Sequence, residues 1–265
     1  IRRLIGRSVW ALTKQMEKSD FVPGGYEMKF GSGKIDRIDI CEDKDCVYVK
    51  VTDYKTGTKS FDITAMYHGL QMQLPVYLNA AIGIEKEKYP DREIIPAGIF
   101  YYRVKDPIVD REETEEDTEK SMLKELRLDG LVNGDPEVVS HLEKDLSGSS
   151  LFFPIERNKN GSLGKRSKAL PGSTFDAVLS YAEKKEQKIT EEMYEGKVEA
   201  SPYELGSASG CDFCSYRDIC GFDVRIDGCG YRKLEKYSME EAVAKMVMEV
   251  EEDGRTVDGG TEESH

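Results

Sequence analysis

The sequence predicts an α/β fold in which a helix, three antiparallel strands, a second helix and a fourth strand follow one another. Apolar side chains in the first segment recur at the spacing of an amphipathic helix. Three short segments with alternating or β-branched residues then follow, separated by turns rich in glycine or charge. These elements, in the order αβββαβ, are expected at residues 3–18, 26–30, 34–41, 46–54, 63–82 and 94–104.

The second helix contains two residues that disfavour helical structure, Gly69 and Pro75. Asp62 stands where a helix N-cap is expected, and a kink is expected at Pro75 because proline removes a backbone donor. Gln73 and Tyr77 lie one turn apart and therefore share a face of this helix.

Four domain segments are expected along the chain. Residues 1–104 form the core, and 105–200 form a mostly helical extension packed on it. Residues 201–235 are rich in cysteine and turns, and 236–265 comprise a short helix and an acidic, disordered tail.

The composition is that of a folded protein, since 38% of the 265 residues are apolar. No apolar run approaches the ~18 residues of a membrane helix, and Ile1 is not followed by a signal peptide. We therefore expect a cytoplasmic protein without a membrane partner. Because the chain does not begin with methionine, we expect it to be part of a longer one.

The net charge of −13 would argue against binding nucleic acid if it were evenly spread. Residues 110–120 hold seven acids and two bases, and residues 249–263 hold seven acids and one base, which leaves −2 for the rest. A basic groove within 159–168 is compatible with this distribution, although such a cluster is more often a solvated loop.

The two strands at 34–41 and 46–54 carry the residues of a candidate metal site. Asp36 and Asp53 supply carboxylates, Tyr54 supplies a backbone carbonyl, and Lys55 lies two residues after Asp53 on the same face. Oxygen ligands of this kind suit Mg²⁺, which can activate water for phosphodiester hydrolysis. Taken alone, an Asp-x-Lys triplet is more often a solvated strand end.

Three neighbouring features change this interpretation: Gly-x-Ile-Asp at 33–36, Thr-Gly at 56–57, and the pair Gln73 and Tyr77 on the following helix. Together with the Asp-Tyr-Lys triplet, they resemble the RecB-type branch of the PD-(D/E)xK nucleases, whose restriction-endonuclease-like core has the order αβββαβ. The resemblance implies Mg²⁺ or Mn²⁺ as cofactor and DNA as substrate. It implies that the catalytic residues are Asp36, Asp53, Lys55, Gln73 and Tyr77, with Asp36, Asp53 and the Tyr54 carbonyl as metal ligands.

The same resemblance implies a further ligand, His or Glu, on an earlier helix. Glu17 and Glu27 are nearby acids, but neither stands in the expected pattern. We therefore expect this ligand upstream of Ile1, which would leave this fragment inactive alone. His68, on the second helix, is more often a core or boundary residue than a ligand.

Cys211, Cys214 and Cys220 concentrate three thiols in ten residues, a density that suits Zn²⁺ or an iron-sulfur cluster. Spacing does not separate these two. The pattern resembles the C-terminal cysteines of the AddB family of helicase-nuclease proteins, which implies a [4Fe-4S] cluster with a fourth cysteine before the nuclease core. We expect that cysteine upstream of Ile1 and the cluster to be absent or incomplete in this fragment.

These resemblances imply a metal-dependent DNA exonuclease domain within a helicase-nuclease that processes double-strand ends for recombinational repair, with AddA as partner. Two alternatives stay open: a Cas4-like nuclease, and an inactive module with the same fold that binds DNA or a partner. The chain lacks a Gly-x4-Gly-Lys-Ser/Thr phosphate loop, so ATP hydrolysis is expected elsewhere.

Overall fold

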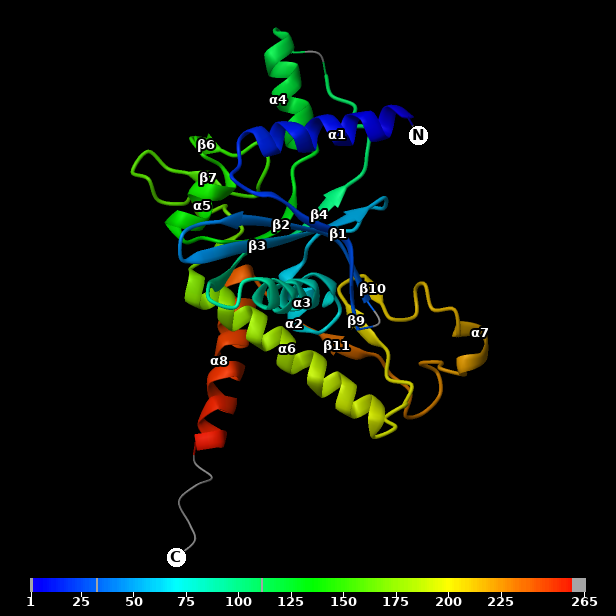
Figure 1. Cartoon of the computed structure of the whole chain (residues 1–265). Coiled ribbons are helices and arrows are strands. Elements are labelled where there is room, and N and C mark those ends of the chain that lie inside the picture. Colours follow the sequence, from blue (N-terminus) through cyan, green and yellow to red (C-terminus); the bar gives the residue numbers. More distant parts are fainter. Residues whose placement is uncertain (1, 32, 111, 259–265) are drawn as a thin grey trace, which may run out of the picture. The chain divides into compact units, whose positions relative to one another are not determined.

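The structure is a computed structural model that describes residues 2–31, 33–110 and 112–258 (Figure 1). The chain forms two compact units. The first comprises Ile1–Phe61 and Met72–Leu179, and the second comprises Asp62–Gln71 and Ser180–His265.

The first unit is built on a six-stranded sheet with the strand order β1-β2-β3-β4-β5-β8. Strands β1 to β3 form an antiparallel meander, β4 runs parallel to β3, and β5 is antiparallel to β4. The predicted order αβββαβ is confirmed. The elements of this unit are α1 (Arg2–Glu17), β1 (Val22–Phe30), β2 (Gly33–Glu42), β3 (Cys46–Lys55), α3 (Gln73–Lys88), β4 (Glu93–Arg103), α4 (Glu115–Glu125), β5 (Asp129–Asn133), α5 (Pro136–Leu142), β6 (Gly148–Ser149), β7 (Glu156–Arg157), β8 (Ala169–Leu170) and the start of α6 (Gly172–Tyr194).

The prediction of one long helix over 63–82 is wrong, because two helices occupy this region. Helix α2 (Ile63–Tyr67) is capped by His68 and followed by Gly69, whose φ of +78° lies in the left-handed region that glycine tolerates. Helix α3 then begins at Gln73. Pro75 lies in the first turn of α3, where its missing N–H costs no intrahelical bond, so it causes no break.

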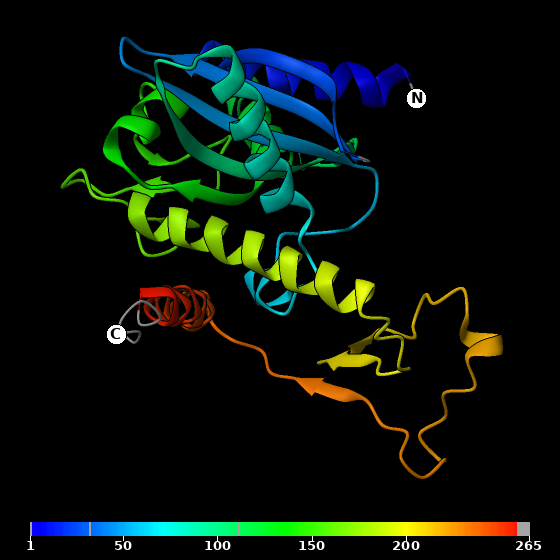
Figure 2. The same ribbon diagram turned by 60° about the horizontal axis from the view of Figure 1, so that its bottom comes forward.

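The two faces of the central sheet are covered by different helices. Helix α3 packs against β2, β3 and β4 on one face, and α1 lies over the other, as Figures 1 and 2 show. Ala11 of α1 belongs to a buried cluster with Tyr48 of β3 and with Phe100 and Tyr102 of β4. Burial of each such aromatic side chain contributes about 1.5–3 kcal/mol, so this cluster holds the sheet against α1.

The α1 side of the sheet also contains a buried ion cluster formed by Arg37, Asp39 and Lys50, whose side chains are 6%, 1% and 3% exposed. Arg37 Nε donates to Asp39 Oδ1 over 2.7 Å, and Lys50 Nζ pairs with Asp39 Oδ2. Burial lowers the pKa of Lys50, and the Asp39 charge opposes this effect. One carboxylate therefore holds two buried cations between β2 and β3.

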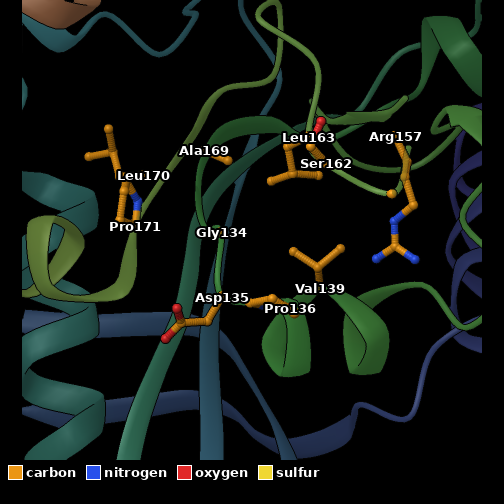
Figure 3. Close-up of a pocket in the computed structure, with 11 residues that line it drawn as sticks. Gly134, Asp135, Pro136, Val139, Arg157, Ser162, Leu163, Ala169, Leu170 and Pro171 are labelled. Carbon is orange, nitrogen blue, oxygen red and sulfur yellow. The ribbon is translucent and has the colours of Figure 1, made fainter. Parts of the chain in front are cut away.

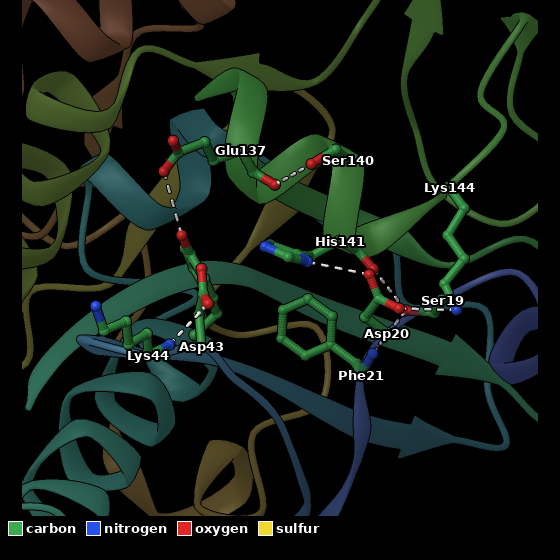
Figure 4. A network of polar contacts seen from close by, with 10 residues as sticks. Ser19, Asp20, Phe21, Asp43, Lys44, Glu137, Ser140, His141 and Lys144 are labelled. Carbon is green, nitrogen blue, oxygen red and sulfur yellow. Dashed lines mark hydrogen bonds and ion pairs between the residues drawn. The ribbon is translucent and has the colours of Figure 1, made fainter.

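A second polar network fastens α5 to the connection between α1 and β1 (Figure 4). The two oxygens of Asp20 lie 3.0 Å from His141 Nδ1 and 2.7 Å from Lys144 Nζ. The Ser19 hydroxyl donates to the His141 carbonyl over 3.1 Å. The hydrogen bond from Lys144 lowers the pKa of Asp20, as expected for a structural ion pair.

The second unit combines helices and a small three-stranded sheet. Tyr181 on α6 donates to the Tyr67 carbonyl of α2 over 2.7 Å, and Thr64 of α2 donates to the Tyr237 carbonyl over 2.9 Å. Its further elements are α7 (Arg217–Cys220), α8 (Met239–Asp258), β9 (Tyr203–Leu205), β10 (Ala208–Ser209) and β11 (Arg232–Leu234).

Helix α8 spans Met239–Asp258, so the expectation of a short helix within 236–265 is wrong and much of the expected acidic tail is helical. The rest of the predicted acidic tail, residues 259–265, lies outside the described residues. Within the part of the chain that the structure describes, no helix combines the length and apolar character needed to cross a membrane.

Candidate active site

Asp36 and β3 are joined by a side-chain hydrogen bond. The Tyr54 backbone N–H donates to Asp36 Oδ2 over 2.9 Å. The antiparallel register pairs Arg37 with Thr52, which directs Asp36 and Asp53 to the same face of the sheet. That face is the one covered by α3.

Asp53 and Lys55 form an ion pair in which Lys55 Nζ lies 2.5 Å from Asp53 Oδ2. The Asp53 side chain is only 3% exposed, whereas Lys55 is 23% exposed. Burial raises the pKa of Asp53, and the nearby Asp36 carboxylate adds to this rise, while the Lys55 charge opposes it. A buried carboxylate beside a second one is a site where a cation is favourable.

Gln73 and Tyr77 extend this arrangement from β3 to α3. Lys55 Nζ donates to Gln73 Oε1 over 2.9 Å, and Gln73 Nε2 donates to the Tyr77 hydroxyl over 2.9 Å. The Tyr77 ring packs edge-on against Phe30, with 5.6 Å between centroids. This chain of contacts fixes the Lys55 ammonium from two directions.

The structure therefore brings together the catalytic residues expected from the sequence. Asp36, Asp53, Lys55, Gln73 and Tyr77 all lie in the first unit and are linked by the contacts above.

Two further residues adjoin this group and were missed by sequence reasoning. Tyr101 of β4 pairs in register with Asp53, and the buried Tyr101 hydroxyl has no hydrogen-bond partner among the described residues. The Nζ atoms of Lys55 and Lys59 lie 5.5 and 5.3 Å from the centroid of its ring. Strand alternation could have indicated Tyr101, but nothing in the local pattern marks Lys59.

The donor set at this site fits a hard divalent cation only in part. Asp36, Asp53 and the Tyr54 carbonyl provide oxygen ligands of the right kind. Across residues 2–31, 33–110 and 112–258, however, no group of three or more His, Cys, Asp or Glu side chains is close enough to hold a metal. Glu17 pairs with Lys14, and Glu27 pairs with Lys34. A cation here would therefore be completed by water or by a ligand outside the described residues.

His68 belongs to the second unit, whereas the five linked residues belong to the first. It caps the end of α2, where its Nε2 lies 2.8 Å from the Glu235 carbonyl oxygen. This contact supports the structural interpretation of His68.

Cys211, Cys214 and Cys220 line one pocket of about 400 Å³ in the second unit, together with Arg217 and Tyr231. All six cysteines of the chain are free thiols. The three share a pocket wall, but within the described part of the chain they do not converge as a set of metal ligands.

A separate pocket of about 380 Å³ lies in the first unit between the start of α5 and the segment around β8 (Figure 3). Its wall is largely apolar and includes Val139, Leu163 and Leu170, with Arg157 and Asp135 as its charged members. None of the candidate catalytic residues lines it. We assign it no role in catalysis.

Comparison with known proteins agrees with the geometry of the site. The family model of the PD-(D/E)XK nuclease superfamily matches residues 1–221. The chain is 34% identical, over its whole length, to a protein of Caldanaerobacter subterraneus subsp. tengcongensis that is named as a subunit of an ATP-dependent helicase/deoxyribonuclease. It is 38% identical over 91% of its length to the protein of the same description from Lachnoclostridium phytofermentans.

The chain spans 24% and 22% of the length of these two relatives. The match to the family model covers most of the chain and includes both the five linked site residues and Cys211, Cys214 and Cys220. The chain therefore belongs to the PD-(D/E)XK nuclease superfamily.

Proposed function

We propose that this chain is a metal-dependent deoxyribonuclease domain that hydrolyses phosphodiester bonds of DNA. The observation that carries this proposal is the linked group of Asp36, Asp53 and Lys55, in which Gln73 fixes the lysine. An inactive binding module would not need a buried carboxylate whose pKa is raised by its own site.

Asp36, Asp53 and the Tyr54 carbonyl would hold Mg²⁺ or Mn²⁺. When bound, such a cation neutralises phosphate charge and makes water a stronger acid. The Lys55 ammonium, positioned by Asp53 and Gln73, would stabilise the negative charge that develops on the phosphate oxygens. The hydrogen bond from Gln73 to Tyr77 keeps the amide oriented so that its oxygen faces Lys55.

The larger assembly is inferred from the relatives, whose names describe parts of ATP-dependent helicase/deoxyribonucleases. We propose that the domain acts as an exonuclease at double-strand DNA ends during recombinational repair in the cytoplasm, with an AddA-type helicase-nuclease as partner. A match over the whole chain supports this over a Cas4-like nuclease, because the region from 105 to 200 is included.

Cleavage of end-labelled DNA tests the enzymatic part of the proposal. We expect the full-length protein to cleave with Mg²⁺ or Mn²⁺ but not with EDTA. Asp36→Asn should reduce the rate roughly 10²-fold, because it removes one charged metal ligand while the amide oxygen can still accept the Tyr54 N–H. Asp43→Asn, in the exposed turn between β2 and β3, is the matched control. Equal rates for Asp36→Asn and the control would contradict the assigned role of Asp36.

We also propose that Cys211, Cys214 and Cys220 ligate a [4Fe-4S] cluster in the full-length protein, with a fourth ligand from another part of that protein. Their common pocket supports this. Anaerobically purified protein should contain about four iron and four sulfide per chain, and Cys214→Ser should lose them. Stoichiometric zinc without iron would show that the site is a zinc site instead.

A further inference from the structure

We propose that Lys59 binds a phosphate group of the DNA backbone beside Lys55 and so is a further substrate-binding residue of the nuclease site. The inference rests on the proposed nuclease function and adds a residue that lies outside the Asp-Tyr-Lys-Thr-Gly segment.

The position of Lys59 is defined by Tyr101. The ammonium groups of Lys55 and Lys59 lie 5.5 and 5.3 Å from the centroid of the same Tyr101 ring. Tyr101 is 1% exposed and pairs in register with Asp53. Both ammonium groups therefore lie beside the ring of the residue that pairs with Asp53, and the attraction of the ring for cations favours this position.

The two lysines differ in what else they contact. Lys55 is engaged by Asp53 Oδ2 at 2.5 Å and by Gln73 Oε1 at 2.9 Å. Lys59 is exposed and has no ion pair with a carboxylate within the described ranges of the chain. No carboxylate of the described residues therefore contacts the Lys59 ammonium directly, and the ammonium is available to an anionic ligand.

The loop that carries Lys59 is anchored at both ends. The Lys55 carbonyl accepts a hydrogen bond from the Val104 N–H over 2.9 Å. At the other end, the Phe61 N–H donates to Asp129 Oδ2 over 2.8 Å, and Asp129 Oδ1 lies 2.7 Å from Lys168 Nζ. Residues 56–60 therefore form a short, exposed loop, and hydrogen bonds hold the residues at both of its ends in place.

The charges of the site explain how a second ammonium group, that of Lys59, favours binding of a phosphodiester. Asp36 and Asp53 together carry two negative charges, and Lys55 offsets one of them, so these three groups alone repel a phosphodiester. Lys59 restores neutrality even before a divalent cation binds. A lysine acts here as a compact charge on a long stem, which suits the backbone of DNA regardless of its base sequence.

Binding measurements on the full-length protein test this directly. Fluorescence anisotropy with a labelled single-stranded oligonucleotide is measured in Ca²⁺, which takes the same kind of oxygen ligands as Mg²⁺. We expect Lys59→Ala to weaken binding about 5-fold and to reduce the slope of log K against log salt by about 0.7, the value for one phosphate contact on a single strand. Lys59→Arg should retain wild-type slope and affinity, and Lys44→Ala, in an exposed turn, should resemble wild type.

Cleavage measurements then separate this inference from the proposed function. If wild-type protein cleaves DNA but Lys59→Ala has the KM and salt slope of Lys44→Ala, the phosphate-binding role is wrong and the nuclease assignment stands. If wild type does not cleave DNA, the nuclease assignment fails, and the anisotropy comparison still decides whether Lys59 contacts phosphate. Equal melting temperatures of the two alanine variants exclude loss of folding as the cause.

Discussion

Replacing Asp53 with asparagine is expected to reduce DNA cleavage roughly 10³-fold while leaving the melting temperature unchanged or higher. The loss of rate arises because a charged ligand of the proposed cation is removed and Lys55 loses its ion pair. A reduction of this size corresponds to about 4 kcal/mol of transition-state stabilisation.

The stability part of this prediction follows from the sign of the pKa shift. Burial raises the pKa of Asp53, so the folded protein disfavours its ionised form. The ionised Asp53 therefore costs stability above the raised pKa, and the neutral amide removes that cost. Single-turnover cleavage and thermal unfolding of the same preparation check both parts. A variant that melts well below wild type would show that Asp53 is needed for folding and not only for catalysis.

Replacing Asp39 with asparagine is expected to lower the free energy of unfolding by about 3–5 kcal/mol, because it leaves Arg37 and Lys50 buried without a counter-ion. Urea unfolding monitored by circular dichroism measures this loss. We expect the triple variant Arg37→Met, Asp39→Leu and Lys50→Met to recover most of it, since an apolar cluster of similar volume avoids the desolvation cost of ions.

Comparing Asp39→Asn with the triple variant shows whether the lost stability comes from leaving Arg37 and Lys50 buried without a counter-ion. Asp39→Asn within about 1 kcal/mol of wild type would indicate that water reaches the Arg37 and Lys50 head groups. Reduced cleavage by the triple variant at normal stability would instead indicate that Arg37, whose Nη1 lies 3.4 Å from the Tyr54 hydroxyl, helps to position the strand that carries Asp53.

Much of the first unit could be predicted from the sequence because its signals are local. Strand alternation and the turns around Gly31 and Asp43 define β1 to β3, and the same alternation directs Asp36 and Asp53 to one face. The pair Gln73 and Tyr77 is also local, since helical periodicity alone puts both on one side of α3.

Of the features that were missed, the helix break is a local backbone effect, whereas the positions of Tyr101 and Lys59 depend on contacts between distant segments. The break between α2 and α3 follows from the positive φ of Gly69, and Pro75 is harmless because it falls in a first turn. Tyr101 joins the site through the parallel pairing of β3 with β4. Strand alternation indicates its face of the sheet, but not that it pairs with Asp53. The position of Lys59 beside the Tyr101 ring depends on the same pairing. It also depends on the hydrogen bond from the Phe61 N–H to Asp129 that holds the end of the loop.

The register between β2 and β3 also decides which chemistry each face of the sheet carries. One face presents Asp36 and Asp53 beneath α3, and the other presents Arg37, Asp39 and Lys50. The two sets are separated only by the thickness of the backbone. A deletion of one residue within either strand would reverse its faces, directing a buried cation into the catalytic site and an acid into the core. Length changes in these two strands should therefore be far less tolerated in evolution than side-chain substitutions, whereas the exposed turn between them is free to vary.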